Sequence, residues 1–227
     1  AQAYHLDYRF ADAISYFEKF KGTVNPKDAE TIKDISHRVE WSKNGEELVK
    51  APMPYVISNL GDSVNSPYGD YSPVITADEQ YLYFTSRRSG MGGEDNRTLD
   101  LKYFEDIWYC ERKPDGTWST ARNMGPTVNS FDHEATIGIS ADGSQLFVYK
   151  DPQGDGGIFI SELNGLTWST PEKLGSEPAD ITDINTTSWE THACVSADGG
   201  TLYFVSDRKG GIGGRDIYKC VKLPNGR

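Results

Sequence analysis

The stretch "VSADGGTLYFVSDRKGGIGGRDIY", residues 195–218, decides the fold because related stretches occur twice earlier in the chain. Each begins with a Ser/Thr-Ala-Asp turn, runs into a β-rich segment and paired glycines, and ends in another β-rich segment. The turns are residues 76–78, 140–142 and 196–198, and the β-rich pairs are YLYFTS and DIWYCE, QLFVYK and GIFISE, and TLYFVS and RDIYKC. The "GGIGG" lies between two predicted strands, whereas a phosphate-binding loop needs a strand and a helix, so we interpret it as a hairpin loop.

A fourth β-rich segment follows in two copies, "TWSTARNMG" from Thr117 and "TWSTPEKLG" from Thr167, each after an Asp-Gly or Asn-Gly hairpin turn. "YVISNLG", residues 55–61, has the same ending and is interpreted as one more fourth strand. Four short strands in roughly 50 to 60 residues are typical of a propeller blade. We therefore predict a mainly β fold, a β-propeller of about three blades near residues 71–125, 135–175 and 191–227, within a ring of about six. Because half a ring would expose sheet edges, we expect that the polypeptide continues or that another chain closes the ring.

The first 50 residues have a helical pattern instead. The apolar side chains that can share one stripe of a helix are Ala3, Tyr4, Ala13, Ile14, Phe17 and Phe20, and a second helical run extends from Pro26 to about Val49. The spacing of Tyr4, Ala13 and Phe17 resembles part of a tetratricopeptide repeat. The predicted organisation is a helical segment at 1–50, a linker at 51–55 and a partial propeller at 56–227.

Composition excludes several classes of function. Thirty-four acidic against 23 basic residues give a net charge of −11, which argues against a nucleic-acid partner. No apolar run approaches the roughly 20 residues of a membrane span. Cys110, Cys194 and Cys220 form no metal-ligand spacing. His133 and His192 have no recognisable nucleophile, so we predict no catalytic residues, no metal, no cofactor and no enzyme activity.

Three acidic residues recur at the start of the first strand of each blade. Asp70, Glu134 and Glu190 each stand five residues after an asparagine, in "VNS", "VNS" and "INT" motifs. In a propeller they would form an arc of negative charge at one mouth of the channel, where a cation or a basic partner segment binds. The alternative, which we favour, is that each carboxylate binds backbone amides or the neighbouring blade.

Two further features stand out within the blades. Arginines end two of the second strands and aspartates begin the following strands, which suggests ion pairs that brace the glycine loops, Arg88 with Asp106 and Arg208 with Asp216. The first blade also inserts "EDNRTLDLKYFE", residues 94–105. This loop is the best candidate contact surface, through Leu99, Leu101, Tyr103 and Phe104, unless it packs back onto its own blade. Trp118 and Trp168 recur at one strand position and are interpreted as blade core.

The runs "DYSPVITADEQYLYFTSRRSG", "DHEATIGISADGSQLFVYK" and "ETHACVSADGGTLYFVSDRKGGIGGRDIY", after a helix pair, resemble Bacteroidetes OmpA-family envelope proteins. These join tetratricopeptide-like helices to a TolB-like propeller of WD-repeat-like, PD-type blades, and include the PorE-type component of the type IX secretion system. The resemblance implies a non-enzymatic protein-binding scaffold in the periplasm, associated with the outer membrane. The partners that it implies are envelope proteins, including a PorP/SprF-like outer-membrane β-barrel. Peptidoglycan would be bound only through domains that this sequence does not contain.

Three narrower expectations complete the sequence-based interpretation. "DSV", residues 62–64, fits an O-glycosylation pattern of these bacteria and would place a glycan on Ser63. A glycan-binding propeller, using exposed tryptophans and the acidic mouth, is the alternative function. A glycan hydrolase that pairs Glu134 with Glu190 across the channel is less favoured.

Overall fold

The computed structural model describes residues 1–152, 154, 156–175 and 184–222. The chain divides into two compact units, Ala1–Ser58 and Asn59–Arg227, which are described separately. The division falls three residues beyond the predicted linker at 51–55. Residues 223–227 of the predicted third blade lie outside the described residues.

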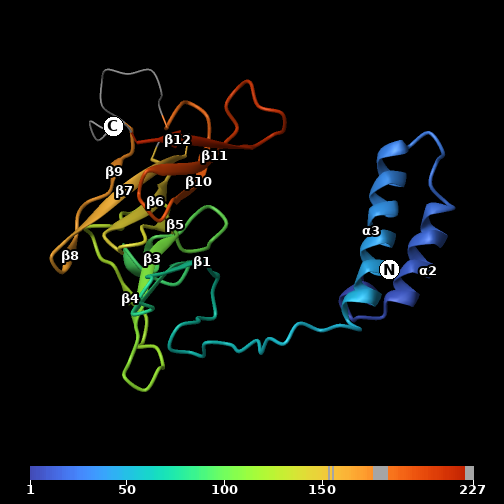
Figure 1. The fold of residues 1–227 in the computed structure, drawn as a ribbon, viewed down its shortest axis with the longest axis horizontal. Coiled ribbons are helices and arrows are strands. Elements are labelled where there is room, and N and C mark those ends of the chain that lie inside the picture. The colour runs from blue at the N-terminus through green and yellow to red at the C-terminus, as the bar shows by residue number, and fades with distance from the viewer. Residues whose placement is uncertain (153, 155, 176–183, 223–227) are drawn as a thin grey trace. The chain divides into compact units, whose positions relative to one another are not determined.

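The first unit contains three helices, α1 (Gln2–Leu6), α2 (Phe10–Lys21) and α3 (Ala29–Leu48) (Figure 1). Helix α3 begins at an Asp28 cap, whose Oδ1 accepts the Thr31 amide at 3.1 Å, and not at Pro26. None of the described helices combines the length and the apolar character that a membrane span requires.

The core of this unit lies between α2 and α3 and is formed by Ala13, Phe17, Ile35 and Val39. The predicted apolar stripe is too wide, because Ala3 is exposed and Phe20 is 55% exposed. One long partner helix covers only a narrow face of α2.

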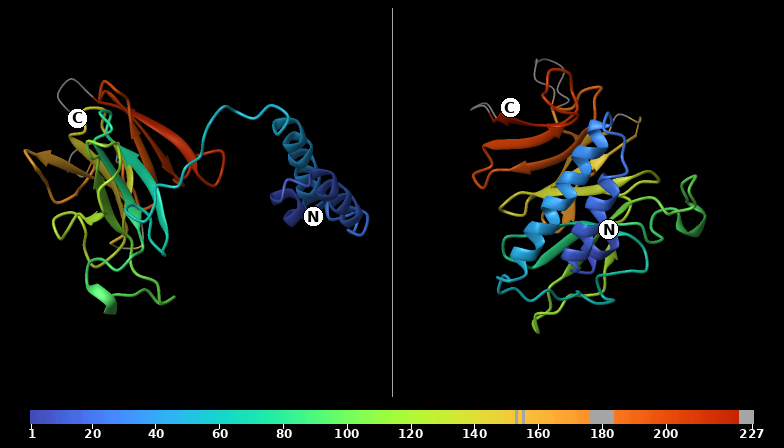
Figure 2. Two further views of the ribbon diagram at one scale, coloured as in Figure 1. Left: turned by 90° about the horizontal axis from the view of Figure 1, so that it is seen from below. Right: turned by 90° about the vertical axis from the view of Figure 1, so that its right-hand side faces the viewer.

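The second unit consists of three antiparallel sheets, which Figures 1 and 2 show lying one beside the next. The first sheet has the order β1 (Asp70–Ile75), β2 (Tyr81–Ser86), β3 (Asp106–Glu111) and β4 (Arg122–Asn123). The second contains β5 (Glu134–Ile139), β6 (Gln145–Lys150), β7 (Gly157–Asn164), β8 (Thr167–Trp168) and β9 (Glu172–Lys173), and the third contains β10 (Glu190–Val195), β11 (Thr201–Ser206) and β12 (Asp216–Val221). The predicted mainly β, partial-propeller fold is confirmed.

The recurring Ser/Thr-Ala-Asp motif is the turn between the first and second strands of each sheet. In the third sheet, the Ser196 hydroxyl donates to Asp198 at 2.5 Å and accepts the Thr201 amide at 2.9 Å. The Asp198 carboxylate also accepts the Gly200 amide at 3.0 Å. The other two turns have the same bonds, so side chains satisfy the turn amides and fix where each hairpin reverses.

Two apolar clusters join neighbouring sheets. One contains Tyr83 and Ile107 of the first sheet with Leu146 and Val148 of the second. The other joins the second sheet to the third and contains Phe147, Ile158, Ala193, Leu202 and Phe204. The blades therefore stack face to face, as propeller blades do.

The predicted fourth strand at 55–61 is wrong in this structure. These residues form no strand, and Val56 and Ile57 are 91% and 98% exposed. The equivalent strands β4 and β9 each pair with a third strand, β3 and β7. Residues 55–61 have no such strand beside them within the described part of the chain.

Candidate functional site

The three recurring acids cap the turns that lead into their strands. Asp70 Oδ2 accepts the Ser66 amide at 2.6 Å and the Ser66 hydroxyl at 2.8 Å. Glu134 accepts the same two groups of Ser130 at 2.8 and 2.5 Å. Glu190 accepts those of Thr186, both at 2.9 Å. A hydroxyl residue four positions before each acid, the last residue of each VNS or INT motif, therefore completes the cap.

Each acid also contacts a positively charged side chain. In the first and third sheets this side chain is an arginine, and in the middle sheet it is a lysine. In the first sheet, Asp70 Oδ1 lies 2.6 Å from Arg88 Nη2 and accepts the Ser86 hydroxyl at 2.6 Å. The third sheet repeats this with Glu190, Arg208 at 3.2 Å and Ser206 at 2.7 Å.

In the middle sheet, Lys150 lies opposite Glu134, at the register position that Ser86 has in the first sheet. Its Nζ is 3.0 Å from Glu134 Oε1. One lysine thus occupies the place of the serine and supplies the charge of the arginine.

The acids consequently present no arc of negative charge. Glu134 and Glu190 are fully buried, and Asp70 has a side chain only 10% exposed. Burial raises the pKa of Asp70, but bonds from Ser86, Arg88 and Ser66 outweigh it and lower the pKa below its usual value. With their oxygens engaged, Glu134 and Glu190 have the environment of structural carboxylates and not of an acid/base pair.

The predicted ion pair between Arg88 and Asp106 is wrong. Asp106 is buried and its Oδ2 accepts the Met91 amide and the Asn123 side-chain amide, both at 2.7 Å. Burial raises the pKa of Asp106. The aspartate still braces the glycine loop, but through the backbone amide of Met91.

The same arrangement recurs in the third sheet. Asp216 accepts the Gly213 amide at 3.1 Å, and Arg208 contacts Glu190. In both sheets the arginine extends over the rings of its own blade, with Arg88 4.9 Å from the Trp108 ring centroid and Arg208 5.1 Å from that of Tyr218. This path leads the guanidinium to the acid of the first strand.

Asparagines join the blades, a role that the sequence analysis did not assign. Asn129 Oδ1 accepts the backbone amide of Ile107 at 2.8 Å, and its Nδ2 donates to the Ile107 carbonyl at 2.9 Å. Asn185 holds Ile158 in the same way, at 2.6 and 2.8 Å. We call this two-point contact the asparagine clasp. The signal was available, because an asparagine recurs five residues before each acid.

The inserted loop, residues 94–105, folds into a small hairpin. Tyr103 is buried, bonds through its hydroxyl to Glu94 and Arg97, and accepts Arg87 Nε at its carbonyl at 2.9 Å. Leu99 and Leu101 are 105% and 75% exposed. Of the four candidate contact residues, Leu99 and Leu101 therefore lie at the tip of the hairpin and Tyr103 lies in its base.

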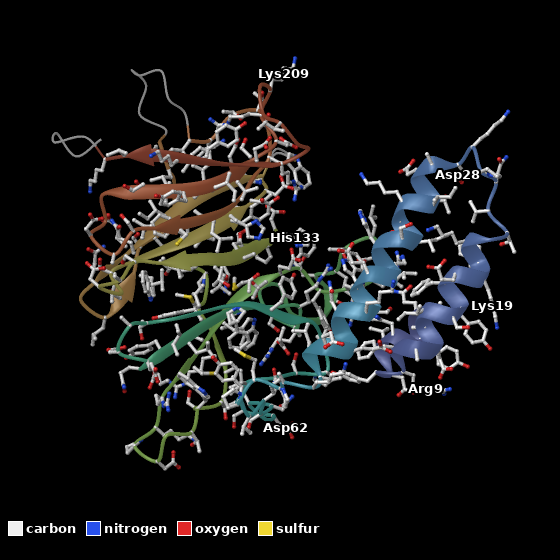
Figure 3. The ribbon with its side chains drawn as sticks, turned by 45° about the vertical axis from the view of Figure 1, so that its right-hand side comes forward. Arg9, Lys19, Asp28, Asp62, His133 and Lys209 are labelled. Carbon is white, nitrogen blue, oxygen red and sulfur yellow. The ribbon has the colours of Figure 1, made fainter. Side chains whose placement is uncertain are left out.

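Phe104 belongs to a polar and aromatic cluster at the base of this loop. Its ring lies 4.7 Å from that of His133, whose Nδ1 is 2.6 Å from Glu105 Oε2. Tyr71 also donates to Glu105. His133, just before β5, lies among the propeller strands (Figure 3) and fastens the loop to the second sheet.

The tryptophans expected in the blade core are packed. Trp168 meets Tyr83 edge to face at 5.7 Å, and Trp118 packs against the cluster of Leu82 and Cys110. Both side chains are partly buried. The candidate glycosylation residue, Ser63, is half-buried, and its carbonyl accepts the Ala121 amide at 2.8 Å.

The helical unit has an open apolar groove of about 490 Å³. Its lining includes Leu6, Tyr8, Trp41 and Leu48, all of which are more than half exposed. Phe10 forms part of the lining and packs where Gly45 leaves room, because a Cβ at Gly45 would lie 2.5 Å from the Phe10 ring. The groove is a second exposed apolar surface.

No protein-family profile matches this sequence, and no curated protein matches it. Among solved structures, TolB from Acinetobacter baumannii is similar with a TM-score of 0.40 and 14% identity, over 66% of this chain and 29% of that chain. A protein assigned as TolB from Agrobacterium tumefaciens is similar with a TM-score of 0.35 and 15% identity, over 69% and 59% of the two chains. The chain thus spans less than two thirds of the length of either protein.

Proposed function

We propose that this chain is a non-enzymatic scaffold that binds other proteins of the bacterial cell envelope. We place it in the periplasm, associated with the outer membrane, as a component of type IX secretion and gliding or of a related barrel-associated complex. The sequence resemblance to OmpA-family envelope proteins supports this assignment. The saturated bonding of Asp70, Glu134 and Glu190 agrees with it, because these residues serve the fold.

The observation that carries the proposal is Leu101. Its φ of +62° is left-handed, a conformation that for a residue other than glycine costs on the order of 1 kcal/mol. Burial does not offset this cost, because Leu101 is 75% exposed and the neighbouring Leu99 is fully exposed. Two leucines on a hairpin braced by Tyr103 form a contact surface for a protein partner.

A PorP/SprF-like outer-membrane β-barrel is the partner we propose, on the strength of the same resemblance. The hairpin tip would insert its leucines into an apolar depression of the partner. The groove at Leu6, Tyr8, Trp41 and Leu48 provides a separate surface for a second envelope protein.

The test is affinity purification of the native protein from solubilised cell envelope, followed by mass spectrometry. The wild type is compared with Leu99→Ser/Leu101→Asn, since asparagine tolerates the left-handed conformation and should preserve the hairpin. Leu166→Ser is the matched control, a 97% exposed leucine in another turn.

We expect a barrel protein to co-purify with the wild type and the control and to be lost from the double variant. If it stays with the double variant, the hairpin is not the contact surface. If no envelope protein co-purifies with the wild type, the scaffold proposal is wrong.

A further inference from the structure

The inserted hairpin, residues 94–105, is fastened to the segments just before the first strands of two blades. Before β1, the Tyr68 ring meets the Tyr103 ring edge to face at 5.4 Å. Before β5, the Phe131 carbonyl accepts Asn96 Nδ2 at 3.2 Å. The hairpin therefore stands at the junction of the first two blades, and its position beside both segments is fixed.

Exposed apolar side chains continue from the hairpin tip onto these two segments. Phe131 is 64% exposed and Tyr68 is 51% exposed, next to a hairpin whose Leu99 and Leu101 are also in solvent. We call these four residues the hairpin surface. Apolar side chains gathered on loops that a rigid scaffold holds in place are typical of an interaction site.

The charges of the hairpin show which kind of partner this surface fits. Arg97 Nη2 lies 3.3 Å from Glu94 Oε2, and Lys102 Nζ lies 3.0 Å from Asp100 Oδ2, so these four charges neutralise one another. Asp95 is exposed, and no group in the described part of the chain bonds to its carboxylate. The hairpin thus keeps one unpaired negative charge.

A second unpaired carboxylate lies on the other side of the same contact. Asp132 is exposed and has no ion pair or side-chain hydrogen bond with any residue that the structure describes. Asp95 precedes Asn96 and Asp132 follows Phe131, so the bond between Asn96 and Phe131 brings the two acids to adjoining segments. Carboxylates attract a cation by charge, and the face of an exposed aromatic ring attracts it through the ring quadrupole.

This inference rests on the proposed function and adds the chemistry of the partner. We propose that the hairpin surface binds a polypeptide segment in which a lysine or an arginine lies between apolar residues. The basic side chain lies over the Phe131 ring near Asp95 and Asp132, and the apolar side chains contact Leu99 and Leu101.

Other segments fit this surface less well. An acidic segment is repelled by the two carboxylates, and a purely apolar segment removes water from them without supplying a positive charge. The net charge of −11 adds a long-range attraction that favours the approach of a basic segment.

The first experiment titrates two peptide probes into the full chain labelled with nitrogen-15 and follows the amide shifts by NMR. The probes are N-acetyl-Leu-Arg-Leu-amide and N-acetyl-Leu-Gln-Leu-amide. The arginine probe should give saturable shifts at residues 95–101 and 131–132 and should bind about fivefold more tightly than the glutamine probe. Equal affinity for the two probes, shifts confined to other residues, or no shifts would overturn the proposal.

A charge-neutral variant tests the two carboxylates directly. Asp95→Asn/Asp132→Asn should abolish the preference for the arginine probe and leave the affinity for the glutamine probe unchanged. Glu30→Gln/Glu40→Gln is the matched control, because it removes two exposed carboxylates of the helical unit and changes the net charge equally. If the control loses the preference to the same extent, net charge alone causes it and the proposed site is wrong.

The same variant separates this inference from the proposed function in the purification from cell envelope. The barrel protein should be lost from Asp95→Asn/Asp132→Asn as it is from the double leucine variant. If the leucine variant loses it and the aspartate variant keeps it, the scaffold proposal stands and the basic segment is wrong. If the wild type captures no envelope protein but prefers the arginine probe, the proposed function is wrong and the binding chemistry of the hairpin surface stands.

Discussion

Replacing Asn129 with alanine should destabilise the propeller unit by about 3 kcal/mol. The substitution removes the side-chain acceptor of the Ile107 amide, and leaving a buried amide unsatisfied costs roughly 2 kcal/mol. The Ile107 carbonyl loses its bond from Asn129 but keeps the one from the Met124 amide at 3.1 Å, so that loss adds about 1 kcal/mol. The assay is urea unfolding followed by tryptophan fluorescence, to which Trp108, Trp118, Trp168 and Trp189 of this unit contribute.

Asn65→Ala is the matched control, because it changes the same repeat position in the first blade, where the Asn65 side-chain amide donates to Asn59 and clasps no strand among the described residues. It should change the free energy of unfolding by less than about 0.5 kcal/mol. Asn129→Asp should be at least as damaging as the alanine variant, since it keeps an acceptor for the amide but turns an anion toward the Ile107 carbonyl. Equal small effects at positions 65 and 129 would refute the clasp as a stabilising contact.

Three further predictions concern the buried charges and the glycine loop. Lys150→Met should lower the free energy of unfolding by roughly 3 kcal/mol in urea titrations, because Glu134 stays fully buried without its cation. Gly90→Ala should lower the melting temperature, since a Cβ would lie 1.9 Å from Asp106 Oδ2, whereas Gly69→Ala, where the nearest atom is at 3.6 Å, should be tolerated. Asp70 has a lowered pKa in the folded state, so its contribution to stability is complete above the unfolded-state pKa of about 3.9 and is lost as the pH falls further. The stability difference between the wild type and Asp70→Asn should therefore shrink below about pH 4, which acid titration of the unfolding curves measures.

The blades could be predicted from sequence because their signals are local. The Ser/Thr-Ala-Asp turn and the alternating runs on either side of it fix a hairpin through side-chain bonds within a few residues. The fourth strands were harder, because β4 and β9 are only two residues long and depend on the third strand beside them. At residues 55–61 the same sequence pattern is present, but without a neighbouring strand it forms no sheet.

The candidate sites were less predictable because recurrence does not identify a bonding partner. Asp70 of the first strand and Asp106 of the third strand both lie opposite Ser86 of the second strand. Spacing alone therefore could not show which of the two carboxylates Arg88 would contact. The sequence also did not show which residues of the inserted loop would be exposed to solvent. Leu99 and Tyr103 are separated by a few residues, yet the hairpin leaves one in solvent and buries the other.

The middle blade shows which part of the acid motif the fold requires. Lys150 replaces a serine, and no arginine follows it two positions later, yet Glu134 remains buried and ion-paired. The common requirement is therefore a neutralised carboxylate that accepts the turn amide before the first strand, whichever residue supplies the positive charge. The arginines of the outer blades do something more, because Arg88 and Arg208 also donate to the carbonyls of Val64 and Ile184, immediately before an asparagine of the clasp motif. In the third blade this bond supports an occupied clasp at Asn185, and in the first it supports Asn65.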